Sequence, residues 1–441
     1  MATDLKRISE KARKEPKLVF TSLYHHICDV DNLRACYDTL GARKASGVDG
    51  VTKTEYGKNL EENLQDLSAR LKRMGYRPGP KRRSYIPKAG SAKGRPLGIS
   101  NLEDKIVEAA TKRTLEPIYE AVFEQSSYGY RPGSNQHKCL EALGRTIQQG
   151  KVNHVVEADI KSFFDQVNHD WMVKFLRHRI GDERVIRLVI RMLKSGILED
   201  GLMSATEKGT AQGSILSPLL SNIYLHYVLD LWFSRRVRRQ SRGEAVYFRF
   251  ADDFLACFQY KDDAEQFLQR LRDRIEGFGL TLAEDKTQCI EFGRFARDQA
   301  QKRGEKPKDF TFLGFTHYCG KTKAGYFKLK RRTSRKKLGQ SLRTFTEWAT
   351  KAHHVQRKGE MIRSARTRVV GHLNYYAITD NADRCNYYVY CATAILFKWL
   401  NRKSQRKAYT WAQFSQALAW IGWPSVRIRT DLNPCRRAEA Y

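Results

Sequence analysis

The chain has 441 residues and carries 80 lysines and arginines against 48 aspartates and glutamates, a formal net charge of +32 at pH 7. This clustered positive excess argues against a merely soluble basic protein and favours a polyanionic partner, most simply a nucleic acid. Hydrophobic residues make up 41 % of the chain, which supports a sizeable core in two or three domains.

The cysteines and the apolar runs indicate where the protein works. The nine cysteines form no C-x-x-C pair, so neither a zinc module nor a redox motif is indicated. The chain does not start with a signal-peptide apolar stretch. Its most apolar run, residues 215–233, contains Pro218 and Asp230, which indicates a buried helix rather than a membrane span. We therefore expect a cytoplasmic protein with no membrane partner.

The first 80 residues are predicted to form an N-terminal extension of helices and loops. Apolar residues recur at helical spacing in 18–40, a glycine-containing loop follows at 41–50, and a single apolar stripe runs from Tyr56 to Leu71.

A basic hairpin is predicted next. No acidic residue stands between Ser68 and Leu102, and residues 84–88 and 95–99 look like two strands joined by a turn. Such a hairpin can hold a triphosphate or a nucleic-acid backbone. It fits equally well as a solvated edge hairpin that lysines protect from aggregation. Its basic residues include Arg82, Arg83, Lys88 and Arg95.

Helices dominate the following stretch. We predict a helix that starts at Asn101, a loop at 123–133, a helix near 136–149 and another at 180–198. A later helix follows the loop at 208–218 and is predicted to be capped by Ser214 or Ser217. The remaining segments of this region are predicted as a helix at 264–278 capped by Asp262 or Asp263, short strands at 280–286 and 289–292, an exposed loop at 293–309 and a strand at 310–315.

Three carboxylates stand out among these elements. Asp252 and Asp253 lie between two apolar, β-prone runs, which predicts a hairpin over 246–258 whose turn carries both. Adjacent like charges cost energy unless water or a cation takes them up, and alone the pair fits a solvated turn. The predicted strand 155–160 carries Asp159 close to its end, and carboxylates from two neighbouring strands can bind two divalent ions about 4 Å apart. We expect Asp159 and Asp252 to be the principal pair, with Asp253 nearby.

The C-terminal part is basic and aromatic. Between Phe310 and Thr346 no acidic residue occurs, and the rest reads as helical. Basic residues interleaved with aromatic ones suit phosphate contacts and base stacking. The candidate nucleic-acid contacts here are Lys330, Arg331, Arg332, Arg335, Lys336, Lys337, Tyr375, Arg402 and Lys403.

Several motifs in order resemble those of reverse transcriptases. They are Arg95-Pro-Leu-Gly, Asp159-Ile-Lys-Ser-Phe-Phe-Asp, Gln212-Gly-Ser-Ile-Leu-Ser-Pro, Phe250-Ala-Asp-Asp and Phe312-Leu-Gly-Phe. Gly47-Val-Asp-Gly, Tyr128-Gly-Tyr-Arg-Pro-Gly and Gly371-His-Leu-Asn-Tyr-Tyr are similar to bacterial group II intron-encoded proteins. The resemblance covers about residues 30 to 420.

The resemblance implies an α+β fold of the right-hand polymerase type, with fingers and palm built on an antiparallel sheet. A helical thumb or maturase domain follows them in the chain. The implied boundaries are an N-terminal extension at 1–80, fingers and palm at 81–315, the thumb at 316–423 and a short basic tail at 424–441. No HNH endonuclease is expected in that tail, so we expect priming from a pre-existing 3′ end.

The resemblance also implies roles for single residues. Asp159, Asp252 and Asp253 would bind two Mg²⁺ ions, or Mn²⁺ in their place, together with the carbonyl of Ile160. The residues of the implied dNTP site are Lys88 and Arg95 at the triphosphate, Phe164 against a 2′-hydroxyl, Gln212 and Gly213 in the lining, and Lys286 as general acid. Phe164 as plain core and Lys286 as a surface lysine remain alternatives. Phe250, where Tyr is commoner, should leave activity intact.

The implied function is RNA-directed DNA polymerisation combined with maturase activity on a group II intron RNA. The implied partners are intron and template RNA, a DNA target or primer strand and dNTP, with monomer and dimer both open. Two alternatives remain: a domesticated relative that acts in DNA repair or phage defence, and a non-catalytic RNA-binding splicing factor. The intact aspartates argue against the second.

Overall fold

The computed structural model describes residues 5–86, 94–199, 201–204, 208–402 and 408–434. Its internal contacts divide the chain into two units. Unit 1 contains Met1–Asn135, Val156–Ala256 and Asp262–Gln288, and unit 2 contains Gln136–Val155, Cys257–Lys261 and Cys289–Tyr441. The boundary expected near residue 315 therefore falls inside unit 2.

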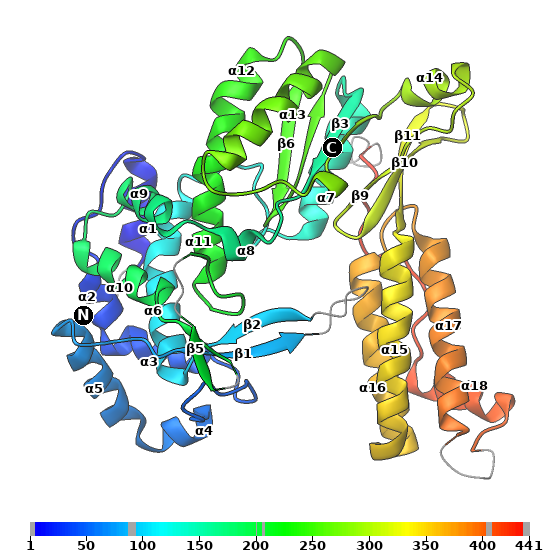
Figure 1. Cartoon of the computed structure of the whole chain (residues 1–441). Coiled ribbons are helices and arrows are strands. Elements are labelled where there is room, and N and C mark those ends of the chain that lie inside the picture. Colours follow the sequence, from blue (N-terminus) through cyan, green and yellow to red (C-terminus); the bar gives the residue numbers. More distant parts are fainter. Residues whose placement is uncertain (1–4, 87–93, 200, 205–207, 403–407, 435–441) are drawn as a thin grey trace. The chain divides into compact units, whose positions relative to one another are not determined.

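The helices of unit 1 form largely where apolar stripes predict them. Residues 18–40 supply two helices, because Asp29 ends the first and caps the second by accepting a hydrogen bond from a backbone N–H at 3.2 Å. The helix predicted at 180–198 is shorter, since Asp182 caps its start and a strand begins soon after Leu193. The helices wholly or mostly in unit 1 are α1 (Leu5–Lys14), α2 (Tyr24–Cys28), α3 (Val30–Thr39), α4 (Lys53–Tyr56), η1 (Gly57–Asn59), α5 (Leu60–Lys72), α6 (Leu102–Glu120), α8 (Phe163–Gln166), α9 (His169–Arg177), α10 (Glu183–Leu193), α11 (Ser217–Leu225), the π-helical η2 (His226–Asp230) and η3 (Phe233–Val237), α12 (Arg238–Gln240), α13 (Lys261–Glu276) and η4 (Glu284–Lys286) (Figure 1).

Both predicted helix caps are wrong. The N-cap of α11 is Leu216, and the Ser214 hydroxyl instead accepts a hydrogen bond from its backbone N–H at 3.3 Å, while Ser217 is the first helical residue. Helix α13 starts at Lys261, three residues earlier than expected, so Asp262 and Asp263 lie in its first turn, where acidic side chains interact favourably with the helix dipole.

Two strands confirm the predicted basic hairpin. Strands β1 (Lys81–Ile86) and β2 (Arg95–Ile99) pair antiparallel. Strand β4 (Ile197–Glu199) pairs parallel with β1 and antiparallel with β5 (Leu202–Ser204), which gives the sheet order β2-β1-β4-β5.

A second four-stranded sheet has the order β6-β7-β3-β8. Its strands are β3 (His154–Ala158), β6 (Ala245–Phe250), β7 (Asp253–Phe258) and β8 (Gln288–Glu291). Ala251 and Asp252 alone connect β6 to β7, which confirms the predicted hairpin, and Ala251 has a left-handed φ of 60°. The N–H of Asn153 donates to the carbonyl of Phe258 at 3.0 Å, so β3 and β7 run antiparallel. The residue after β3 and the first residue of β7 therefore lie at the same end of the sheet.

Unit 2 contains the predicted helix α7 (Gln136–Gln149) and a three-stranded antiparallel sheet. The strands of that sheet are β9 (Phe310–Phe312), β10 (Phe315–Lys321) and β11 (Phe327–Thr333), in the order β11-β10-β9. The segment 293–309, predicted as an exposed loop, contains α14 (Ala296–Lys302). This helix forms because Ala296 and Ala300, one turn apart, are both buried.

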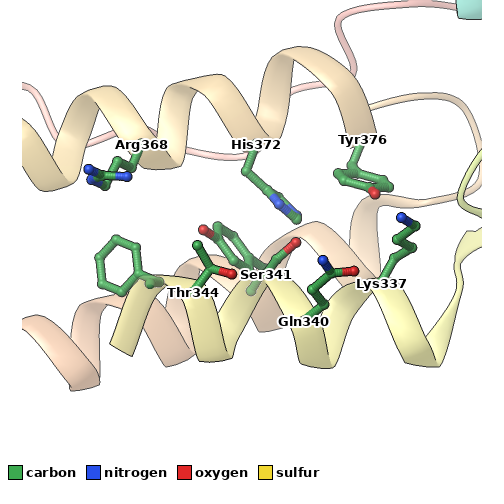
Figure 2. Close-up of a pocket in the computed structure, with 9 residues that line it drawn as sticks. Lys337, Gln340, Ser341, Thr344, Arg368, His372 and Tyr376 are labelled. Atoms are coloured by element: carbon green, nitrogen blue, oxygen red, sulfur yellow. The ribbon is translucent and has the colours of Figure 1, made fainter. Parts of the chain in front are cut away.

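Within the described residues of unit 2, four helices follow the sheet: α15 (Arg335–Val355), α16 (Lys358–Tyr376), α17 (Ala382–Leu400) and α18 (Trp411–Ile421). Only two residues join α15 to α16, so these helices are antiparallel, and α17 packs against both (Figure 1). A pocket of about 410 Å³ lies between α15 and α16 (Figure 2). None of the helices within the described ranges is long and apolar enough to cross a membrane.

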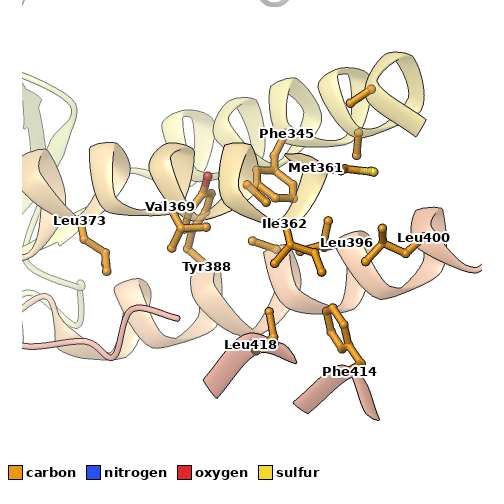
Figure 3. Close-up of a cluster of buried hydrophobic side chains, with 14 of the residues drawn as sticks. Phe345, Met361, Ile362, Val369, Leu373, Tyr388, Leu396, Leu400, Phe414 and Leu418 are labelled. Carbon is orange, nitrogen blue, oxygen red and sulfur yellow. The ribbon is translucent and has the colours of Figure 1, made fainter. Parts of the chain in front are cut away.

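One apolar cluster joins α15, α16, α17 and α18 (Figure 3). Phe345, Ile362, Leu396 and Phe414, one from each helix, are at most 2 % exposed. Because these side chains bury each other, the helical part of unit 2 has a hydrophobic core of its own.

Truncation of one core residue should measure the strength of this cluster. Leu396→Ala removes a fully buried side chain and should lower the free energy of unfolding by about 2–5 kcal/mol, because it adds a cavity to the lost burial. Chemical denaturation of the full chain measures the change. Val355→Ala, at a position that is 82 % exposed, is the control and should change the stability little. Equal effects of the two substitutions would contradict the assignment of the core.

Candidate active site

The three predicted carboxylates lie at one end of the second sheet. Asp159 follows β3 directly, Asp252 lies in the β6–β7 connection and Asp253 is the first residue of β7. Partial desolvation, followed by repulsion from the other two carboxylates, raises the pKa of Asp253 to about 6. Desolvation and Asp159 also raise the pKa of Asp252. The three side chains thus form one electrostatically coupled group whose repulsion a bound cation would relieve.

Two basic side chains act on this group. The Lys286 ammonium donates a hydrogen bond to the carboxylate of Asp159, and this bond is the main reason why the pKa of Lys286 is raised. Arg95, exposed at the start of β2, acts on Asp252 in the opposite sense to the carboxylates and favours its charged form. The positive charge of the site therefore comes from two elements outside the sheet.

The backbone next to Asp159 pairs in a way that leaves the Ile160 carbonyl outside the pairing. Ile160 forms an isolated antiparallel bridge with Leu282. The two hydrogen bonds of this bridge, both 2.8 Å long, use backbone groups of the residues on either side of Ile160. The carbonyl of Ile160 is therefore not used by the bridge.

The residues present fit a hard divalent cation. Within the described ranges, no three His, Cys, Asp or Glu side chains lie close enough together to hold a metal ion as they stand. The candidate donors are nevertheless all oxygens, namely three carboxylates and a carbonyl, which are the ligands that Mg²⁺ prefers. In the structure the ammonium of Lys286 supplies positive charge at Asp159, so we expect this ion pair to open when a cation binds.

The Gln212–Gly213 loop packs closely on β2. The N–H of Gly98 donates to the carbonyl of Gln212 at 2.7 Å. Gly213 has φ of 107°, and a Cβ there would meet the carbonyl oxygen of Gly98 at 3.0 Å, so glycine is needed at this position. The Gln212 Oε1 atom is buried and has no hydrogen-bond partner among the described residues. A bound nucleotide would satisfy this acceptor through an N–H or O–H group.

Two adjacent phenylalanines, Phe163 and Phe164, follow Asp159 in the chain and differ in their burial. Phe163 is 2 % exposed and packs edge-on against Tyr224, so it is the core residue of the pair. Phe164 is only half-buried, and its ring contacts that of Phe163 edge-on at 5.5 Å. Its role against a 2′-hydroxyl stays a prediction, as do the roles of the other nucleotide contacts. Lys88 lies outside the described residues.

A buried ion pair between Arg249 and Asp230 supports the β6–β7 turn. Arg249 of β6 is fully buried, and its Nε and Nη2 atoms donate to the carboxylate of Asp230 at 2.7 and 2.6 Å. Its other donors reach Asn222 Oδ1 at 2.9 Å, the carbonyl of Ala251 at 3.0 Å and Ser127 Oγ at 2.7 Å. All five N–H groups of the guanidinium are therefore used, and one of them holds the backbone next to Asp252.

A family model described as "Reverse transcriptase (RNA-dependent DNA polymerase)" matches residues 86–317. This match spans just over half of the chain and contains Asp159, Asp252, Asp253, Gln212 and Lys286. The chain belongs to the reverse transcriptase family. Members of this family generally use divalent metal ions, in agreement with the donor set described above.

Known proteins of several organisms are similar to this reverse transcriptase. The "Group II intron-encoded protein LtrA" of Lactococcus lactis subsp. cremoris is 38 % identical over 231 residues, which cover 52 % of this chain and 38 % of LtrA. The "Protein YkfC" of Escherichia coli (strain K12) is 34 % identical over 315 residues, which cover 64 % of this chain and 82 % of YkfC. "Nuclear intron maturase 2, mitochondrial" of Arabidopsis thaliana is 26 % identical over 188 residues, covering 33 % of this chain and 25 % of that protein.

Three groups near the reverse transcriptase site were not predicted from the sequence. Tyr130, with a left-handed φ of 58°, lies close enough to the site that desolvation and the charge of Asp252 raise its pKa. Glu108 of α6 is 2 % exposed and accepts a hydrogen bond from the N–H of Ile215 at 2.9 Å, which anchors the loop after Gly213. The third group is the Arg249 pair. The only local signal was a charged residue inside a run of apolar ones.

The predicted nucleic-acid contacts differ in how the structure uses them. Arg82 donates to the carbonyl of Ser46 at 2.8 Å, and Arg83 lies 3.4 Å from the carboxylate of Glu199, so both are partly engaged inside unit 1. In unit 2, Arg335, Lys336 and Lys337 are exposed on the first turn of α15, Lys330 and Arg332 are half-buried on β11, and Arg402 lies over Trp399. The Tyr375 hydroxyl donates to a backbone carbonyl at 3.0 Å. Lys403 lies outside the described residues.

Arg331 was predicted wrongly as a nucleic-acid contact. It is 2 % exposed, and its guanidinium donates to the carbonyl of Leu140 at 3.0 Å. The reason is the alternation of β11, which directs Arg331 inward between the half-buried Lys330 and Arg332. Gly144 of α7 leaves room for the guanidinium, because a Cβ there would meet its Nη2 atom at 2.1 Å.

Removal of Arg249 should destabilise unit 1. Arg249→Met leaves the carboxylate of Asp230 buried without its partner, which should lower the free energy of unfolding by about 3–5 kcal/mol in chemical denaturation. The double variant with Asp230→Leu should lose less than the two single losses together, because no unpaired charge remains. Arg272→Met, which removes an exposed ion pair, is the control and should change the stability little. Additive losses in the double variant would contradict the coupling.

Acid should weaken the same region through His226. Burial lowers the pKa of this histidine, which lies 4.0 Å from Asp230, to about 4. Between pH 6.5 and pH 4 the unfolded chain therefore binds a proton that the folded chain does not, so stability falls as the pH falls through this window. At pH 5 the loss should be on the order of 2 kcal/mol. Relative to its own stability at pH 8, His226→Leu should lose less stability on acidification than the wild type. The same pH dependence in both proteins would contradict the assignment.

Proposed function

We propose that this chain is an RNA-directed DNA polymerase that extends a primer strand with deoxynucleotides along an RNA template. The observation that carries the proposal is the coupled group of Asp159, Asp252 and Asp253 at one end of the β6-β7-β3-β8 sheet. Membership of the reverse transcriptase family supports it. In the reaction, the 3′ oxygen of the primer forms a bond to the α-phosphorus of the dNTP, and the bond from that phosphorus to pyrophosphate breaks.

The carboxylate end of the sheet would hold the cofactor. The three aspartates and the carbonyl of Ile160 are the residues that would bind two Mg²⁺ ions, or Mn²⁺ in their place. When bound, such ions acidify the 3′-hydroxyl and stabilise the leaving pyrophosphate. Arg249 keeps Asp252 in place by binding the carbonyl of the preceding residue. Lys286 would leave Asp159 and give a proton to the pyrophosphate.

The nucleotide would lie along the loop and hairpin next to the aspartates. Arg95 and Lys88 would bind its triphosphate, and the unsatisfied Oε1 of Gln212 would accept a hydrogen bond from it. Gly213 allows the loop to lie against β2, and Phe164 would exclude a 2′-hydroxyl by its bulk. These roles follow from the family motifs and from the local geometry of each residue.

We further propose that unit 2 binds a group II intron RNA and assists its splicing and mobility. LtrA, to which the chain is similar over 38 % of that protein's length, is named as a group II intron-encoded protein. Exposed Arg335, Lys336 and Lys337 offer phosphate contacts on α15. A cytoplasmic location belongs to the same proposal and agrees with the free thiols of all eight cysteines in the described ranges.

Primer extension by the purified full chain tests the polymerase. On an RNA template with Mg²⁺, the wild type should extend a DNA primer with dNTP and far less well with NTP. Asp252→Ala should lower the rate by at least about 10³-fold, because it removes a carboxylate that binds the cation. Phe250→Tyr, in the same turn, is the matched control and should retain activity. Equal extension by wild type and Asp252→Ala would refute the assignment, and extension with NTP alone would refute the proposed substrate.

A further inference from the structure

The pocket between α15 and α16 has one row of side chains on each wall. Figure 2 shows the side chains of Arg368, His372 and Tyr376, spaced four residues apart on α16, pointing toward α15. The opposite row, from Lys337 to Thr344, has the spacing of one helix face. The nine lining residues are Lys337, Gln340, Ser341, Thr344, Phe345, Arg368, His372, Tyr376 and Tyr388.

Several polar side chains of this pocket have no hydrogen-bond partner among the described residues. The side chains of Gln340, Ser341 and Thr344 donate or accept no hydrogen bond within the described part of the chain. The Nε2 atom of His372 is buried and likewise has no partner among the described residues. Buried polar groups are normally satisfied, so the Nε2 atom of His372 indicates a ligand with a hydrogen-bonding group of its own. The half-buried Gln340 and Ser341 and the exposed Thr344 stand beside it and can bind the same ligand.

The charge of the pocket indicates that this ligand is an anion. Lys337 stands at one end and Arg368 at the other, and none of the nine described lining residues is acidic. The Arg368 guanidinium is exposed and lies 4.7 Å from the ring centre of Trp348, a contact that favours a position beside the pocket. Two cations separated by a polar row suit a ligand with phosphate groups on either side of an uncharged part.

Aromatic rings supply the third feature. The His372 and Tyr388 rings stack with centroids 3.5 Å apart, and the Tyr376 ring lies 4.6 Å from that of His372. Burial lowers the pKa of His372 to about 4, so its ring is neutral at physiological pH and acts as an uncharged aromatic surface. Stacked aromatic rings beside polar groups are typical of sites that accept an unpaired nucleobase.

We propose that this pocket binds one unpaired nucleotide of an RNA strand, with its base between α15 and α16 and its flanking phosphates on Lys337 and Arg368. The volume of about 410 Å³ is within the range of small-ligand sites. The hydroxyls of Ser341 and Thr344 can bind a ribose 2′-hydroxyl, and for this reason the proposed ligand is RNA rather than DNA. The inference rests on the proposed function, because it requires a reverse transcriptase that binds RNA.

A bulky side chain in the pocket tests the proposal. Thr344→Trp, at an exposed lining position, should fill the pocket and weaken binding of a short single-stranded RNA about tenfold, because one stacked base is lost. Thr367→Trp is the matched control, since it places the same residue at an exposed position of α16 outside the pocket. The wild type and the control should bind that RNA more tightly than an RNA with abasic residues, and Thr344→Trp should not. Photo-crosslinks from 4-thiouridine in the RNA should map to α15 and α16.

The outcomes separate this inference from the polymerase proposal. Equal RNA affinity of Thr344→Trp and Thr367→Trp, or crosslinks only outside α15, α16 and α17, would overturn the nucleotide pocket even when the wild type copies RNA. Equal pocket-dependent affinity for a DNA strand of the same sequence would overturn the choice of RNA. Failure of the wild type to bind or copy RNA would refute the proposed function itself. If Thr344→Trp melts early, Arg368→Gln against Arg363→Gln makes the same comparison through a phosphate contact.

Discussion

The position of the β6–β7 turn depends on one buried guanidinium. Arg249 lies on β6, two residues before Ala251, and its five N–H groups reach an aspartate, an asparagine, a serine and the turn itself. A buried charge destabilises the fold unless it is fully paired. The loss of any one of these contacts would therefore leave a buried polar group without its partner. The loop that carries Ser127 is thereby tied to the β6–β7 turn. Its next residues follow the same path, because a Cβ on Gly129 would meet the N atom of Ala251 at 2.2 Å.

This support allows the site to hold charges that repel each other. The pKa values of Asp252 and Asp253 are both raised by desolvation and by neighbouring carboxylates, so their ionised forms do not stabilise the fold by themselves. The stabilising interactions lie elsewhere. One is the buried pair of Arg249 and Asp230, and others are the hydrogen bonds that Glu108 accepts from Ser100 and Ile215. The supporting charges are therefore separate from the carboxylates that are proposed to bind a cation, so these carboxylates can respond to a ligand while the Arg249 pair stays intact.

The sequence predicted what depends on local pattern and missed what depends on distant contacts. The hairpin at 246–258, the basic hairpin and the helix at 136–149 follow from alternation, helical spacing and turn residues, and the structure confirms them. Arg331 and Arg249 could not be read in this way. Both are strand arginines whose inward direction is set by the sheet, and the carbonyl that accepts from Arg331 is 191 residues away. A run of basic residues predicts a solvated surface unless the face of each one is known.

Helix α15 has one face in the apolar core and another face that is proposed to bind a nucleotide. Its Leu338, Phe345 and Ala349 are buried in the helical cluster, so the packing of unit 2 is already provided by that side of the helix. The polar lining residues of α15, from Lys337 to Thr344, take no part in this apolar packing, whereas Phe345 contributes to both the core and the pocket. The side chains of Gln340, Ser341 and Thr344 have no hydrogen bonds in the described part of the chain. Positions on which folding does not depend can carry side chains that suit a ligand. A polar, basic row beside stacked rings is therefore more simply explained by recognition of a phosphate-linked base than by stability of the bundle.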